Sequence, residues 1–358
     1  MRTRRWFGAA GAALLLGAAA GAGAQPGDRL ERFREMARLY AQESWARGPE
    51  AAEAVLRQIF ALVDAEVLEN LSSGEPFASA AFVQERLDAF GGAWGAARFR
   101  VARFETGPRD PAPITIGLFH LWDVERGGLL RVYGRVEGRA ALLAAESRDG
   151  EPDVHPWPAG RGGEPQILAT WVGTASGQGS RPFHAEVWRR TAEAAVRRVW
   201  STAELHPDGL LVSDWKIKAG ELVVRYELRY PGWKPGCPGQ AEAVDTYRPG
   251  GAAVTLARHQ VGNGWHRELG AAAARLFAAL GRGDQRALAE LVPDPGLRRR
   301  LPAGLRAEPA CDQQSPDAPG TVMTVALSER EGASAPWSLS WRRGPRGWRL
   351  LGATPVLQ

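Results

Sequence analysis

The fold class is decided by one stretch of sequence, Leu222-Val223-Val224-Arg225-Tyr226-Glu227-Leu228-Arg229-Tyr230. Apolar and aromatic side chains alternate with charged ones along this stretch, so an extended chain would have one apolar face and one charged face. Such alternation is typical of an antiparallel strand with one face buried and the other in water. The middle of the chain is therefore predicted to be β-rich.

Outward from this stretch, a period of two recurs from Arg98 onward, and short turn sequences such as Ala219-Gly220 separate the segments. We therefore expect an antiparallel, sandwich-like β-rich domain over residues 98–266. Proline and glycine in 148–165 predict a loop or hinge inside it. Tryptophans that recur every 12 to 18 residues leave a propeller as the alternative. They stand at Trp157, Trp171, Trp188, Trp200, Trp215 and Trp233.

Helical spacing of apolar residues flanks the β-rich region on both sides. Residues 25–97 predict a helical segment, with a second helix that starts at Pro49. Residues 267–358 predict a helix pair followed, after the proline-rich stretch 293–319, by a three-strand meander. The whole chain is thus expected to be an α+β protein.

The stretch Phe277 to Asp284, between the two C-terminal helices, and the closing hairpin from Trp341 to Leu350 make residues 267–358 resemble the nuclear-transport-factor-like or cystatin-like α+β superfamily. This resemblance implies a sheet curled around a helix, forming a cone that holds a small ligand or is filled by core side chains. Enzymatic members, such as SnoaL-like cyclases, place acids and histidines in the cone. Residues 267–358 contain no histidine, so that catalytic pattern is not carried over.

The first 24 residues predict an export signal. Three arginines precede a weakly apolar Gly/Ala/Leu run, and Ala22 and Ala24 fit a small-residue peptidase site, with cleavage after Ala24. The segment Thr3-Arg4-Arg5-Trp6-Phe7 resembles the twin-arginine class of bacterial signal, and a general secretory signal is the alternative. The mature protein is therefore expected in the periplasm or outside the cell.

The composition bears on which kinds of partner the protein could bind. The 45 Lys and Arg residues fall to 42 after cleavage, against 40 Asp and Glu, and the two signs are interleaved, so no nucleic-acid partner is expected. No apolar run after the signal is long enough for a membrane span. The two cysteines, Cys237 and Cys311, are predicted to form a disulfide in an oxidising compartment, with free thiols or a redox pair as alternatives.

The sequence carries no signature of a nucleophilic serine, a dinucleotide-binding loop or a phosphate-binding loop, so no catalytic residue and no cofactor are expected. His184 and Glu186, two apart on a predicted strand, would share a face, but spacing nominates no further metal ligand, and a solvated face is the preferred interpretation. Acidic pairs such as Asp214 and Glu227 leave a hydrolase acting on carbohydrate or cell-wall material as the alternative function.

One loop stands out, Tyr230 to Gly239, because its prolines and glycines hold an aromatic ring and a cation in a stiff connection beside Cys237. Tyr230, Trp233 and Lys234 are the candidate residues for binding a ligand or partner. The other interpretation of Trp233 is a side chain that caps the sheet. The leading hypothesis is an exported, non-enzymatic protein that binds a small ligand or an envelope protein.

Overall fold

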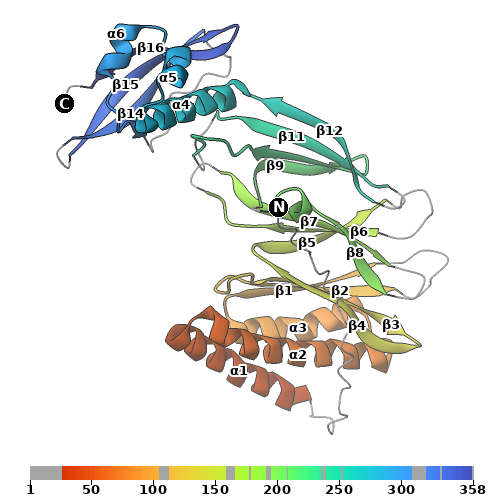
Figure 1. The fold of residues 1–358 in the computed structure, drawn as a ribbon. Helices are drawn as coiled ribbons and strands as arrows, with labels where there is room; N and C mark the ends of the chain where they lie inside the picture. Colours follow the sequence, from red (N-terminus) through yellow and green to blue (C-terminus); the bar gives the residue numbers. More distant parts are fainter. Residues whose placement is uncertain are drawn as a thin grey trace, which may run out of the picture. The chain divides into compact units, whose positions relative to one another are not determined.

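The computed structural model describes residues 26–104, 113–158, 166–176, 179–190, 195–207, 209–234, 237, 239–250, 253–308, 320–330 and 333–356. These residues form six α-helices, one 3-10 turn and sixteen strands in three antiparallel sheets (Figure 1). The predicted α+β fold class is confirmed. The chain divides into two compact units, Met1–Leu62 and Val63–Gln358.

The first unit contains helix α1 (Pro26–Arg47) and the beginning of helix α2 (Pro49–Ser73). Gly48 links the two helices with a positive φ of 85°, a conformation that glycine adopts without strain. Phe33 and Tyr40 on α1, and Ile59 on α2, are buried at helical spacing. Among the helices described, none is long and apolar enough to cross a membrane.

The second unit begins with the rest of α2, and helix α3 (Ala80–Trp94) follows and packs on a four-stranded sheet. This sheet has the order β1 (Ala97–Phe104), β2 (Ile114–Leu121), β3 (Gly128–Val136) and β4 (Arg139–Arg148). The Gln84 amide of α3 bonds to the backbone of the edge strand β1, donating to the Phe99 carbonyl at 2.8 Å and accepting from the Val101 N–H at 2.8 Å. The helix thereby covers part of an otherwise unpaired strand edge.

An eight-stranded sheet follows, in the order β12-β11-β10-β9-β7-β6-β5, with β8 paired to β7. Its strands are β5 (Glu151–Trp157), β6 (Gln166–Val172), β7 (Arg181–Arg190), β8 (Val196–Ser201), β9 (Leu210–Lys218), β10 (Glu221–Glu227), β11 (Glu242–Arg248) and β12 (Thr255–Gly262). On β10, Val224 and Tyr226 are buried and Arg225 is exposed, as the alternation predicted. The alternation is wrong at Glu227, which is buried after a register shift against β9 between Arg225 and Tyr226. The described strands form open sheets rather than propeller blades.

The loop predicted for 148–165 is wrong over Glu151–Trp157, where the chain forms strand β5. Pro152 and Pro156 lie on this strand, and β5 pairs only with β6 among the described strands. An edge strand tolerates proline because the missing N–H groups are not needed for a second neighbour. The prolines of this stretch therefore indicate an edge strand rather than a hinge.

Two apolar clusters hold the β-rich region together. In one, Ile116 and Val132 of the first sheet pack with Trp171 and Trp188 of the second, which makes this part sandwich-like. The other cluster, which includes Trp157 and Trp200, comes from the eight-stranded sheet alone. These four tryptophans are buried, so they belong to the apolar core.

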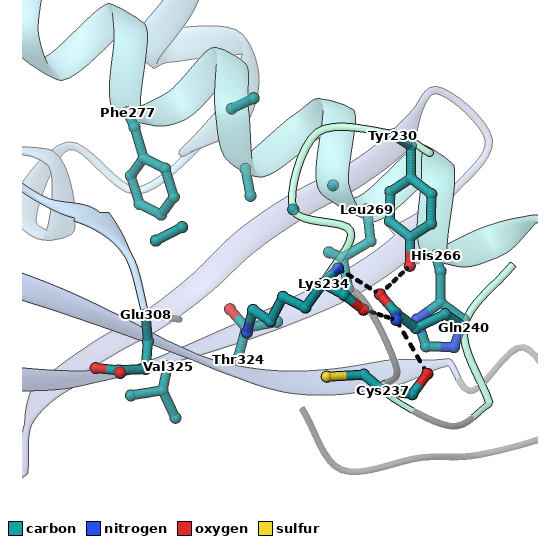
Figure 2. A pocket seen from close by; sticks show the side chains of 15 residues that line it. Tyr230, Lys234, Cys237, Gln240, His266, Leu269, Phe277, Glu308, Thr324 and Val325 are labelled. Carbon is teal, nitrogen blue, oxygen red and sulfur yellow. Dashed lines mark hydrogen bonds between the residues drawn. The ribbon is translucent and has the colours of Figure 1, made fainter. Parts of the chain in front are cut away.

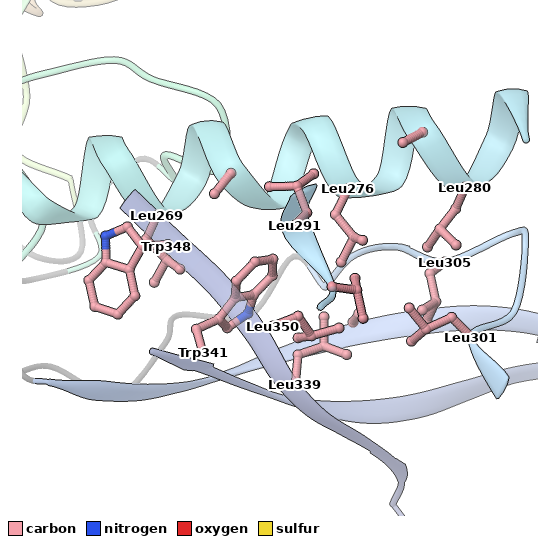
Figure 3. Close-up of a cluster of buried hydrophobic side chains, with 14 of the residues drawn as sticks. Leu269, Leu276, Leu280, Leu291, Leu301, Leu305, Leu339, Trp341, Trp348 and Leu350 are labelled. Carbon is pink, nitrogen blue, oxygen red and sulfur yellow. The ribbon is translucent and has the colours of Figure 1, made fainter. Parts of the chain in front are cut away.

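The C-terminal part packs helices α4 (Trp265–Arg282), α5 (Gln285–Leu291) and α6 (Pro295–Arg300) on a sheet of β13 (Arg306–Ala307), β14 (Thr321–Arg330), β15 (Ala333–Gly344) and β16 (Gly347–Pro355). Figure 3 shows Leu269, Leu276 and Leu280 of α4 directed toward the sheet, with Leu269 beside Trp348 and Leu280 beside Leu305. The helix pair and the three strands are present as predicted. The proline-rich stretch also contains α6 and β13, which the prediction omitted.

Candidate functional site

A cavity of about 120 Å³ lies between helix α4, the loop that follows β10, and the strands β13 and β14 (Figure 2). Its volume is close to that of an apolar protein cavity of about 150 Å³ that binds benzene. The residues that line it are Tyr230, Gly232, Lys234, Cys237, Gln240, His266, Leu269, Gly270, Ala273, Ala274, Phe277, Ala307, Glu308, Thr324 and Val325.

The α4 wall of the cavity is apolar and made largely of small residues. Leu269 and Phe277 supply the bulk of it, while Ala273 and Ala274 leave room between them. Gly270 allows the loop to approach the helix, because a Cβ at this position would lie 2.0 Å from the carbonyl oxygen of Pro231. Leu269 also belongs to the core cluster, so this wall adjoins the core face of α4.

The loop wall is organised by the buried side chain of Gln240. Its Oε1 accepts hydrogen bonds from the Tyr230 hydroxyl at 3.2 Å and the Lys234 N–H at 3.0 Å. Its Nε2 donates to the carbonyls of Lys234 at 2.5 Å and Cys237 at 3.0 Å. One amide thus fixes the described part of the loop by four hydrogen bonds, shown as dashed lines in Figure 2.

His266 stands at the start of α4, where its ring stacks on Trp265 with 3.6 Å between ring centroids. Burial lowers the pKa of His266 below its usual 6.5, and a hydrogen bond with the Gly239 carbonyl opposes that shift. Its Nε2 is buried and has no hydrogen-bond partner among the described atoms. Neutral His266 therefore contributes its ring to the cavity wall and holds a buried acceptor that the cavity does not expose.

Two opposite charges line the cavity from different walls. Lys234 comes from the loop and Glu308 follows β13, and both side chains are partly buried. In Figure 2 the Lys234 side chain runs from the loop toward Thr324, while Glu308 lies beside Val325. Neither forms an ion pair with a side chain in the part of the chain that the structure describes. Both charges are thus available to a ligand.

The three residues predicted to bind a ligand lie in the same loop but in two environments. Tyr230 and Lys234 line the cavity, whereas Trp233 is not among its lining residues. The Trp233 indole instead donates to Glu227 Oε2 at 3.1 Å, and the Arg229 guanidinium lies 5.5 Å from its ring centroid. These contacts fit the interpretation of Trp233 as a residue that caps the sheet.

The acids weighed for hydrolysis do not converge on the cavity. Glu227 is buried, and its Oε1 accepts a short hydrogen bond of 2.5 Å from the Ser180 hydroxyl. Asp214 lies on β9, opposite Arg225. Neither residue lines the cavity.

The prediction that His184 and Glu186 lie on a solvated face is wrong for Glu186. Its side chain is fully buried, with Oε1 2.8 Å from an Arg148 guanidinium nitrogen and 3.2 Å from one of Arg198. Burial raises the pKa of Glu186, the nearby Glu146 adds to the rise, and Arg148 opposes it. Within the described ranges, no group of three or more His, Cys, Asp or Glu residues is arranged to hold a metal ion.

A second polar cluster lies inside the eight-stranded sheet. The Asp245 carboxylate accepts hydrogen bonds from the Tyr226 and Tyr247 hydroxyls, both at 3.0 Å, and lies 2.6 Å from His259 Nδ1. Burial is the main cause that raises the pKa of both tyrosines, and Asp245 adds to it. Because both Asp245 oxygens make contacts within the sheet, we interpret this cluster as one that stabilises the sheet.

Cys237 is buried and lines the cavity, whereas Cys311 lies outside the described residues. The Cys237–Cys311 bond therefore stays a prediction. His266, Phe277 and Glu308 also line the cavity and were not predicted from the sequence. The small residues Gly270, Ala273 and Ala274 on one side of a helix were an available signal, since they permit close approach of another segment.

No family model matches this chain, and no curated protein or solved structure is similar to it. The resemblance of residues 267–358 to the cystatin-like superfamily stays a prediction. The function must therefore be argued from the cavity itself.

Proposed function

We propose that this chain is an exported protein that binds a small ligand in the cavity between α4, the loop after β10 and strand β14. The observation that carries the proposal is an apolar cavity of about 120 Å³ beside the partly buried charges of Lys234 and Glu308. Protein binding sites for small molecules combine an apolar lining with a few convergent polar groups in this way.

The volume of the cavity indicates the size of the ligand. Because about 150 Å³ is enough for benzene in an apolar cavity, this cavity suits one six-membered ring or a branched alkyl group. The rigid loop favours binding, since four hydrogen bonds to Gln240 order its backbone before a ligand arrives.

The test is a titration of toluene, followed by saturation-transfer NMR and thermal unfolding. Toluene should bind the wild type and raise its Tm, because it stabilises only the folded state. Ala273→Phe and, from the opposite wall, Val325→Phe should fill the cavity and abolish binding. Ala257→Phe, on the exposed strand β12, is the matched control and should bind like the wild type. Equal binding to all four proteins would contradict the proposal.

Export is proposed on the basis of residues 1–24 alone. The arginines, the Gly/Ala/Leu run and the Ala22-Gly23-Ala24 site support it. The intact mass of protein recovered from the periplasm or medium should correspond to a chain that starts at Gln25. An unprocessed chain retained in the cytosol would contradict this part of the proposal.

A further inference from the structure

We propose that the ligand of this cavity is a free α-amino acid with an apolar side chain, whose carboxylate contacts Lys234 and whose ammonium contacts Glu308. This inference rests on the proposed function. Three features support it: the charges of Lys234 and Glu308, which form no ion pair within the described ranges, the apolar wall between them and the polar atoms around them.

The opposite charges come from two separate walls. Lys234 belongs to a loop fixed by Gln240, and Glu308 follows β13, where its N–H donates to the Val325 carbonyl at 3.4 Å. Although both line one cavity, they form no ion pair with each other. A ligand with a single charge would satisfy one of them and repel the other. A ligand with adjacent opposite charges satisfies both.

An α-amino acid carries its ammonium and carboxylate on one carbon atom, and its side chain leaves from that same atom. A zwitterion held between Lys234 and Glu308 would direct an apolar side chain toward Leu269 and Phe277 on α4. The cavity volume of about 120 Å³ fits a phenyl ring or a branched alkyl group. Charge-assisted hydrogen bonds would hold the polar end.

Few other polar groups at the cavity are free to compete for the ligand. The Gln240 amide makes all four of its bonds within the loop, while Thr324 Oγ1 accepts from the Trp341 indole at 2.9 Å and keeps its own proton to donate. His266 Nε2 is also an acceptor without a described partner, but it is buried and lies at the opposite end of the cavity from Glu308 in Figure 2, so we assign it no contact with the ammonium.

The experiment compares four ligands that share a phenyl ring: L-phenylalanine, 3-phenylpropionate without the ammonium, phenethylamine without the carboxylate, and toluene without either. Affinities are measured by calorimetry on the wild type, Lys234→Met and Glu308→Gln. Lys218→Met and Glu204→Gln, at exposed positions on β9 and in the 3-10 turn, are the matched controls.

We expect L-phenylalanine to bind the wild type most tightly. Lys234→Met should weaken the binding of L-phenylalanine and 3-phenylpropionate about fivefold to tenfold, and it should not weaken the binding of phenethylamine, which loses only a like-charge repulsion. Glu308→Gln should weaken the binding of L-phenylalanine and phenethylamine by a similar factor, and it should not weaken the binding of 3-phenylpropionate for the same reason. The controls should match the wild type with every ligand.

Two results would overturn the inference, and they are distinguishable. If toluene binds as tightly as L-phenylalanine, or if neither variant changes any affinity, the zwitterion assignment fails while the proposed ligand-binding function stands. If none of the four ligands binds the wild type, both proposals fail.

Discussion

Gly270 of α4 and Pro231 of the loop after β10 lie so close that a Cβ on Gly270 would stand 2.0 Å from the Pro231 carbonyl oxygen. Backbone cannot move away as a flexible side chain can, so Gly270→Ala should displace the loop from the helix. We expect a loss of about 1–3 kcal/mol in the free energy of unfolding and a weaker affinity for toluene. Urea unfolding and calorimetry measure the two effects.

The control for Gly270 is Gly281 on the same helix. A Cβ there meets nothing within 4 Å, so Gly281→Ala should stabilise the protein by about 0.5–1 kcal/mol through higher helix propensity. If Gly270→Ala were also stabilising, the close contact with Pro231 would be contradicted.

Gln240→Leu should disorder the loop that carries Tyr230 and Lys234. The change removes four hydrogen bonds and leaves buried backbone groups without partners, which predicts a loss of about 2–4 kcal/mol. Amide hydrogen exchange at Trp233 and Lys234 should speed up at the same time. Gln260→Leu, on the exposed strand β12, should change neither property. Unchanged exchange in Gln240→Leu would contradict the assigned role.

The substitution Trp233→Phe distinguishes a role of Trp233 in capping the sheet from a role in ligand binding. The substitution removes the indole N–H that Glu227 accepts at 3.1 Å, so we expect a loss of about 1–2 kcal/mol in the free energy of unfolding. The affinity for toluene should stay within a factor of two, roughly within the scatter of surface substitutions, because Trp233 does not line the cavity. A tenfold weaker affinity with unchanged stability would show that Trp233 binds the ligand.

The pH dependence of stability should contain a contribution from His266. Burial lowers its folded-state pKa below 6.5, so the unfolded chain binds more protons between that lowered value and 6.5. The free energy of unfolding must then fall as pH falls through this window, and the contribution is complete above about pH 7.5. His266→Phe keeps a ring against Trp265 but removes the titrating group.

The measurement is urea unfolding of both proteins at several pH values from about 5 to 8. The variant should lose less stability than the wild type on acidification, while the difference between the two stays constant above about pH 7.5. Parallel curves over the whole range would show that His266 does not contribute.

A Cys237–Cys311 disulfide would protect both thiols from alkylation. Without reductant, the exported protein should gain no mass from iodoacetamide, and after reduction it should take up two labels. A bond that closes a loop of this length is worth about 4 kcal/mol in the chain-entropy account, so reduction should lower the Tm. Labelling without reductant would contradict the bond.

Local sequence patterns predicted most of the secondary structure. Alternation placed Val224 and Tyr226 in the core, although it also placed Glu227 in water, where the structure buries it. Local patterns failed at Pro152 and Pro156, because whether proline fits a strand depends on the absence of a second neighbour, which is a property of the whole sheet.

The candidate site was predictable only in part, for the same reason. The stiff loop that holds Tyr230 and Lys234 is visible as a local composition, and both residues line the cavity. The opposite wall is distant in sequence. Phe277 lies on a helix that also packs into the core. Glu308 lies in a stretch whose sequence predicts irregular structure. No spacing rule connects these residues to the loop, because the sheet and the helix bring them together.

Methyl NMR during a titration with L-phenylalanine tests the central claim most directly. The methyl groups of Leu269 and Val325 line the cavity, whereas those of Leu256 and Val261 lie on the exposed strand β12. A bound phenyl ring should shift the Leu269 and Val325 signals in a saturable manner and leave the Leu256 and Val261 signals in place. Unshifted Leu269 and Val325 signals at saturating ligand would contradict binding in the cavity.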